Sequence, residues 1–193
     1  GDGSQLTNLP LLFSYNSNQA GGIEVANYTT ASGSSAFAVG NDNLASGSYS
    51  TAMGRGTTAS GNDSTALGAN TEASGYGSTA MGYDTTASGI VSTAIGTYTI
   101  ASGDYSTAMG YYTIASGTYS TAMGYETEAS DYTSLVVGKH NLAGYTVTAS
   151  ATEYSLDNTA FVIGNGSSWD NRSDALVVKF NGDATLAGNL NIN

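Results

Sequence analysis

The apolar positions of this chain recur every 14 residues across residues 31–142. Each unit follows the pattern A-S-G-x-x-S-T-A-M-G-x-x-T-x, and eight units follow one another without a gap. We number unit positions from the first Ala. The ninth position is apolar in every unit: Val39, Met53, Leu67, Met81, Ile95, Met109, Met123 and Val137. A short, gap-free repeat of this kind is typical of a solenoid, in which each unit stacks on the next.

A unit of 14 residues is too short for two helices, and its frequent Thr and Gly residues disfavour helix. Two strands of about four or five residues and two corners fit this length. We therefore predict an all-β fold, a parallel β-solenoid whose coils stack at about 4.8 Å. The tenth position is always glycine, and we expect it to form a corner with positive φ: Gly40, Gly54, Gly68, Gly82, Gly96, Gly110, Gly124 and Gly138.

Alternation along the strand Ser-Thr-Ala-Met predicts which side chains enter the core. We expect the seventh and ninth positions, such as Thr51 and Met53, to point into the coil. Ser50 and Ala52 would then form a small outer face, while Thr57 and Ala59 would lie inside. Such a core is thin for one chain, so we expect oligomerisation through the Ser/Ala face.

The segments outside the repeats divide the chain into three parts. We expect residues 1–30 to be a connector with a degenerate first coil, and residues 31–142 to be the eight coils. Residues 143–193 hold an insertion, a coil-like strand and a hairpin: Ala160–Gly164 echoes Ala36–Gly40, and Asn181-Gly182 predicts a tight turn. The chain starts at Gly1 without a visible signal peptide, which suggests a piece of a longer protein.

Charge and composition exclude several classes of partner. Four Lys and Arg residues against 15 Asp and Glu residues give a net charge of −11, the wrong sign for binding nucleic acid. The absence of cysteine excludes disulfides and Cys-based metal sites. No run of 18 apolar residues exists, so we expect no direct membrane insertion by this segment.

Catalytic chemistry has little support in the sequence. His140 is the only histidine and follows Lys139, with no motif that supplies a nucleophile or an orienting carboxylate. We interpret it as a surface or inter-chain structural residue. The scattered Asp residues match neither calcium-binding solenoid repeats nor an EF-hand loop. We therefore expect no enzymatic activity, no cofactor and no metal site.

Tyrosine is the sharper functional signal. Ten of the 14 tyrosines occupy the variable positions 4, 5, 11 and 12 of the units: Tyr49, Tyr76, Tyr83, Tyr98, Tyr105, Tyr111, Tyr112, Tyr119, Tyr125 and Tyr132. Copies at one position would stack along the rod, either as corner packing or as an exposed aromatic ladder suited to contacting sugars and proteins. The candidate ligand contacts are Tyr105, Tyr111, Tyr119 and Tyr125, with Trp169 in the polar loop 165–174.

The units, for example Ser106 to Gly117, resemble the head repeat of YadA-like trimeric autotransporter adhesins. That resemblance implies a left-handed parallel β-roll assembled as a homotrimer, located outside the cell and binding a cell-surface glycan or protein. Thr at the seventh position departs from the family's usual Val. The flanks, residues 1–10 and 163–183, resemble segments of bacterial and phage trimeric fibres, so a bacterial surface and a virion fibre both remain open.

Three alternatives to adhesion follow from the same pattern. The segment is either a phage tail-fibre shaft, a pure spacer or, less favoured, an ice-binding solenoid with Thr rows from Thr51 to Thr121 and from Thr57 to Thr127. Ice binding needs Thr residues pointing outward on a flat face. Both rows are predicted to share a face with core positions, which disfavours this alternative.

Overall fold

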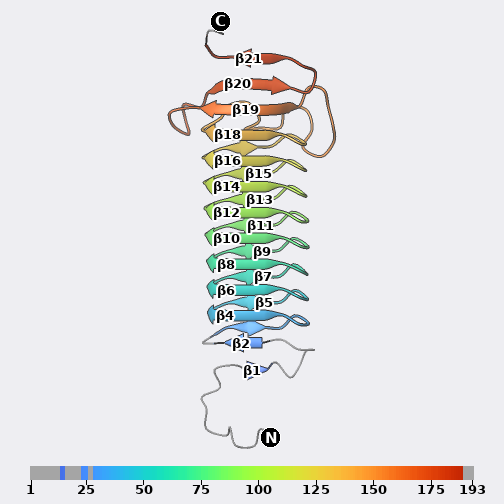
Figure 1. Cartoon of the computed structure of the whole chain (residues 1–193), viewed down its shortest axis with the longest axis vertical. Helices are drawn as coiled ribbons and strands as arrows, with labels where there is room; N and C mark the ends of the chain where they lie inside the picture. The colour runs from blue at the N-terminus through green and yellow to red at the C-terminus, as the bar shows by residue number, and fades with distance from the viewer. Residues whose placement is uncertain (1–13, 16–22, 26–27, 189–193) are drawn as a thin grey trace, which may run out of the picture.

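The computed structural model describes residues 14–15, 23–25 and 28–188, which form a long rod of stacked strands (Figure 1). No helix occurs among these residues. Each 14-residue unit makes one coil, so the predicted all-β solenoid is confirmed.

Each coil contributes one long and one short strand. The long strands cover unit positions 7 to 11: β4 (Phe37–Asn41), β6 (Thr51–Arg55), β8 (Thr65–Ala69), β10 (Thr79–Tyr83), β12 (Thr93–Thr97), β14 (Thr107–Tyr111), β16 (Thr121–Tyr125) and β18 (Leu135–Lys139). The short strands have two residues, fewer than expected, because turns take up more of the coil: β3 (Thr30–Ala31), β5 (Leu44–Ala45), β7 (Thr58–Ala59), β9 (Glu72–Ala73), β11 (Thr86–Ala87), β13 (Ile100–Ala101), β15 (Ile114–Ala115) and β17 (Glu128–Ala129).

Successive coils pair in parallel and in register. Ala80 lies opposite Ala94 and Gly82 opposite Gly96, and the same one-to-one pairing holds along the array. The long strands belong to a 13-stranded sheet and the short strands form an 8-stranded sheet. Every unit position therefore becomes a straight row of side chains along the rod.

The interior between the two sheets contains only small side chains. The alanines of positions 1 and 8 are buried, together with the serines of position 6 and the threonines of position 13. The face predicted for Thr57 and Ala59 is confirmed, whereas that of the long strand is wrong: Ala52 and Ser50 point inward, and Met53 is 39% exposed. The space between the sheets accommodates Ala, Ser and Thr, so the larger ninth-position side chains lie outside.

The glycines of position 10 lie inside the long strands, as the fourth of five residues, and not at corners as predicted. Their φ angles are positive, from 103° at Gly138 to 135° at Gly110. A Cβ on Gly82 would also overlap the carbonyl oxygen of Gly96 in the next coil. The left-handed corners are instead at positions 5 and 12, for example at Tyr105 (φ 57°) and Tyr112 (φ 50°).

Polar side chains terminate the array. Asn43 and Asn141 replace the buried threonine at its two ends, and their Oδ1 atoms accept hydrogen bonds from the N–H groups of Thr57 (2.9 Å) and Glu128 (2.8 Å). Asp131 replaces the glycine of position 3. Its buried carboxylate accepts hydrogen bonds from the N–H groups of Thr148 (2.6 Å) and Thr159 (2.8 Å), which ties the insertion to the last coil.

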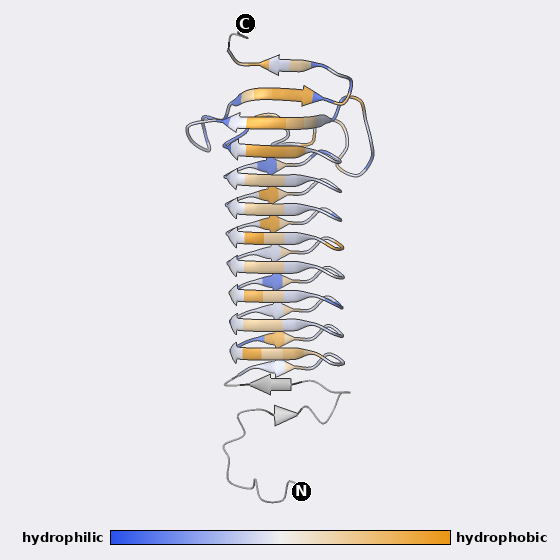
Figure 2. Ribbon diagram, in the orientation of Figure 1, coloured by the Kyte–Doolittle hydropathy of each residue, from blue (hydrophilic) through white to orange (hydrophobic). Residues whose placement is uncertain are grey.

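After the insertion, β19 (Thr159–Asn165) rejoins the stack parallel to β18, with Val162 opposite Val136, as the sequence echo predicted. β20 (Asp174–Lys179) and β21 (Ala184–Leu186) then form the predicted hairpin. β20 also pairs antiparallel with β19, which ends the parallel stack. Figure 2 shows hydrophobic colour concentrated on β18, β19 and β20.

The N-terminal end has a partial coil. β2 (Ile23–Val25) pairs parallel with β4, and β1 (Ser14–Tyr15) pairs antiparallel with β2. The predicted fibre-like segment 1–10 lies outside the described residues.

Candidate binding surfaces

The outer face of the long strands carries an apolar stripe, which we define as the ninth-position side chains from Val39 to Val137. Its four methionines are 37–39% exposed, and the other members are half-buried. With eight rungs about 4.8 Å apart, the stripe is roughly 34 Å long. A continuous apolar row of this length is unusual on a monomer and is typical of an interaction surface.

One of the two Thr rows lies inside the coil, and the other lies on its outer face. The row from Thr57 to Thr127 is buried in the interior, as expected. The row from Thr51 to Thr121 is half-buried and lies on the outer face beside the apolar stripe, which corrects the argument that both rows share a face with the core. The outward row therefore meets one geometric requirement of ice binding.

A turn ladder, which we define as Tyr105, Tyr119 and Tyr132, lies just before the long strands. The rings of Tyr105 and Tyr119 stack with centroids 4.9 Å apart and planes 9° apart, and Tyr132 meets Tyr119 edge-on at 5.7 Å. The backbone N–H of Tyr105 donates to the carbonyl of Ile90 in the preceding coil. Rung-to-rung hydrogen bonds and stacking thus hold Tyr105 and Tyr119 in the left-handed conformation.

A strand-end cluster of aromatic side chains occupies the other end of the long strands: Tyr83, Tyr98, Tyr111, Tyr112, Tyr125 and His140. Tyr98 stacks on Tyr112 at 4.5 Å, and Tyr111 stacks on Tyr125 at 5.0 Å. Edge-on contacts link these pairs into one cluster. Desolvation raises the pKa of both Tyr98 and Tyr125, followed by the neighbouring tyrosines for Tyr98 and by Glu126 for Tyr125, so both hydroxyls remain protonated at neutral pH.

The four tyrosines named as candidate ligand contacts lie in two places. Tyr105 and Tyr119 precede their strands, whereas Tyr111 and Tyr125 end them. All four are exposed. Same-position stacking occurs as expected, but positions 5 and 11 lie at opposite ends of the same strand, so the set makes two ladders and not one surface.

His140 closes the strand-end cluster and is buried rather than on the surface. Its ring lies edge-on to Tyr125 at 5.3 Å, and its Nδ1 lies 3.2 Å from Oε2 of Glu126, outside hydrogen-bond geometry. The side chain packs against Tyr125 and Glu126 of its own chain.

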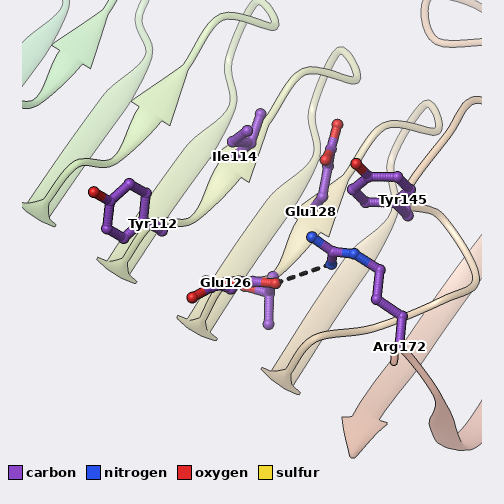
Figure 3. Close-up of a pocket in the computed structure, with 7 residues that line it drawn as sticks. Tyr112, Ile114, Glu126, Glu128, Tyr145 and Arg172 are labelled. Carbon is purple, nitrogen blue, oxygen red and sulfur yellow. Dashed lines mark hydrogen bonds between the residues drawn. The ribbon is translucent and has the colours of Figure 1, made fainter. Parts of the chain in front are cut away.

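A hollow of about 260 Å³ lies where the last coils meet the loop before β20 (Figure 3). Arg172 stands over the ring of Tyr145, with its guanidinium carbon 3.9 Å from the ring centroid. Its Nη1 donates to the carbonyl oxygens of Glu126 (3.1 Å) and Asn141 (3.3 Å). Glu128 and Ile114 reach the hollow from the outer face of the short strands.

The carboxyl group of Glu128 is partly desolvated. Burial raises the pKa of its carboxyl, and the hydrogen bond from Ser130 and the charge of Arg172 offset this only in part. This hollow could not be predicted from the sequence, since its residues belong to different coils and to non-repeating segments. The one available signal was Arg172 itself, one of four cations in an acidic chain.

Trp169 lies beside this hollow and is 71% exposed. It lines a second hollow of about 390 Å³ with Leu142, Tyr145 and Arg172. The turn that carries Trp169 is fixed by a short hydrogen bond between Ser168 Oγ and Asp170 Oδ1 (2.6 Å), which lowers the pKa of Asp170.

The described part of the chain contains no group of three His, Cys, Asp or Glu side chains able to hold a metal ion. Nor does it contain a helix that could cross a bilayer.

Comparison with known proteins identifies the coils. The family model described as YadA head domain repeat (two copies) matches residues 45–71, 73–99, 87–113, 101–127 and 115–140. A comparison with curated proteins gives no match. The matched residues coincide with the regular coils, including their in-register glycines. Residues 45–140 of this chain therefore form a head domain of the YadA-like family.

Proposed function

We propose that this chain is a segment of a homotrimeric extracellular fibre that attaches to a cell-surface glycan or protein and performs no catalysis. The coils would wind as a left-handed β-roll, as in the family it belongs to. The boundaries of its parts would be 1–30, 31–142 and 143–193. Either a bacterial surface or a virion would carry the fibre.

The apolar stripe is the observation that supports trimer formation. The interior of the central coils holds Ala, Ser and Thr, whereas Met53, Met81 and their equivalents remain on the outside. Three stripes facing a common axis would bury those side chains, and each buried side chain of this size contributes roughly 1.5–3 kcal/mol when fully removed from water. The interface is thus the Thr/Met face, in place of the Ser/Ala face expected from sequence.

Adhesion is supported by the aromatic surfaces along the edges of the rod. A trimer presents each ladder three times, so weak contacts would add up through avidity. Two double variants, Tyr105→Ser/Tyr119→Ser and Tyr111→Ser/Tyr125→Ser, test the ladders separately on cells and on a glycan array. Loss of binding by either folded trimer supports the proposal. Full binding by both would leave the shaft as a spacer.

Ice binding is the second candidate, because the row from Thr51 to Thr121 points outward in register. Trimerisation through the neighbouring stripe would cover this row. An assay of ice recrystallisation, run beside sedimentation velocity, separates the two functions: activity requires an exposed row, whereas a stable trimer hides it.

A further inference from the structure

The C-terminal end of the rod has a composite hollow that adjoins the strand-end cluster and shares Tyr112 with it. The two hollows described above share Tyr145 and Arg172 as a common wall. Tyr112 and Glu128 line one part, and Trp169 lines the other. Arg172, Tyr145 and the carboxylate of Glu128 line the first hollow together (Figure 3), and Trp169 lines the second beside Arg172 and Tyr145.

We propose that this composite hollow binds a neutral oligosaccharide, an inference that deepens the adhesive role proposed above. Ligand sites combine aromatic and apolar walls with a few placed polar groups, which is the composition found here. The apolar face of a sugar ring would lie on the exposed ring of Trp169, and sugar hydroxyls would donate to the carboxylate of Glu128.

Glu128 has room to accept such hydrogen bonds. Its Oε1 accepts one long hydrogen bond, 3.3 Å, from Ser130 Oγ. An ionised carboxylate has about four acceptor sites, so most of this capacity remains for a ligand. Because the carboxylate is partly desolvated, hydroxyl donors that replace lost water would bind it well.

Charge selects a neutral ligand. Arg172 is the only cation lining the two hollows within the described residues, and its guanidinium already contacts Tyr145 and two carbonyl oxygens. Glu126, Glu128 and Asp170 also line them, in a chain of net charge −11, which disfavours an anionic sugar. A cationic ligand would compete with Arg172 for the place over Tyr145.

The hollow would stay accessible in the proposed trimer. Ile114 and Glu128 project from the short strands, whereas the apolar stripe projects from the long strands on the other side of the thin core. Both hollows are also built entirely from one chain. Saccharide binding and trimer formation are therefore separable properties.

The test screens the full chain on an array of neutral and sialylated oligosaccharides, and then titrates the strongest neutral hit by saturation-transfer NMR. Glu128→Gln and Trp169→Ala are each expected to weaken binding about tenfold, the loss expected for a hydrogen bond to a charged group or an aromatic contact. Glu72→Gln is the matched control, because Glu72 has the same unit position in a coil far from the hollow.

Each outcome either supports or overturns the proposed saccharide site. Neutral hits that weaken in Glu128→Gln and Trp169→Ala, but not in Glu72→Gln, support the site. No neutral hit, sialylated hits alone, or unchanged binding by both variants overturns it. Sedimentation of the same samples separates the two proposals, since a monomer that binds saccharide rejects only the trimer, and a trimer that binds none rejects only this site.

Discussion

Ala108 and Met109 are consecutive residues of β14 that point to opposite sides of the sheet: Ala108 is fully buried, whereas Met109 is 37% exposed. The larger apolar side chain thus lies outside and the smaller one inside. This arrangement suits a chain whose internal space is too narrow for methionine and whose outer face would pack against further copies in the proposed trimer.

Replacing these neighbours by Glu separates folding from assembly. Ala108→Glu puts a carboxylate into an interior without a counter-ion and is expected to cost several kcal/mol, enough to unfold the coils. Met109→Glu keeps the fold but places three carboxylates near one trimer axis, so the trimer should dissociate. Circular dichroism reports the first effect and sedimentation velocity the second. A trimeric Met109→Glu variant would place the interface elsewhere.

Substitution of Gly82 tests the glycine row. Its φ of 129° and the overlap of any Cβ with the Gly96 carbonyl predict that Gly82→Ala lowers stability by at least about 1–3 kcal/mol per chain, the cost of a strained conformation.

Gly77→Ala is the matched control for that substitution. Gly77 also has positive φ, 62°, but a Cβ there meets only Val91 Cγ2 at 3.5 Å. Other coils place Tyr, Asp or Ser at this position with similar φ. A smaller loss in melting temperature is expected for Gly77→Ala than for Gly82→Ala, and equal losses would contradict the steric argument.

The sequence was sufficient for the coil, because a 14-residue period with invariant glycines admits few folds. It was not sufficient for the faces. Alternation separates Ala108 from Met109 but does not state which side is inside, and the usual preference for apolar cores pointed the wrong way. The missing quantity was the spacing between the sheets, where most repeated inner positions hold Ala, Ser or Thr and the largest fully buried side chains are Val and Asn, such as Val136 and Asn43.

The candidate sites divide in the same manner. Stacking of Tyr105 on Tyr119 follows from one period and was predictable. The separation of Tyr105 from Tyr111 depended on strand length, and the hollow around Arg172 depended on how non-repeating segments fold back on the last coils. Neither feature follows from the 14-residue repeat, so the repeat pattern could not predict it.

Asp131 is predicted to hold the insertion in place. Asp131→Ala would leave the N–H groups of Thr148 and Thr159 without their acceptor, at a cost of about 1–3 kcal/mol for the buried Thr159 and less for the exposed Thr148. The expected result is faster hydrogen exchange at these two amides while the central coils keep their protection. Asp63→Ala, at an exposed turn, serves as the control. Unchanged exchange at Thr148 and Thr159 would show that other contacts suffice.

Glu128 is predicted to make stability pH-dependent at the C-terminal end. Burial raises the pKa of its carboxyl above the ordinary value of 4.5, so the folded chain holds this proton more tightly than the unfolded chain does. The stabilisation from the protonated form is complete below the unfolded pKa and is lost as pH rises through the folded one. At neutral pH the ionised carboxylate therefore opposes folding.

Glu128→Gln removes that ionisation and keeps a similar shape and an acceptor for Ser130. The gain in melting temperature over the unmodified chain should be larger at pH 7 than at pH 4, because the penalty exists only where the carboxylate is charged. Thermal melts at both pH values measure this difference, with Glu72→Gln as the control for losing one negative charge. A Glu128→Gln difference that is constant with pH, or larger at pH 4, would show that Arg172 and Ser130 compensate the buried charge fully.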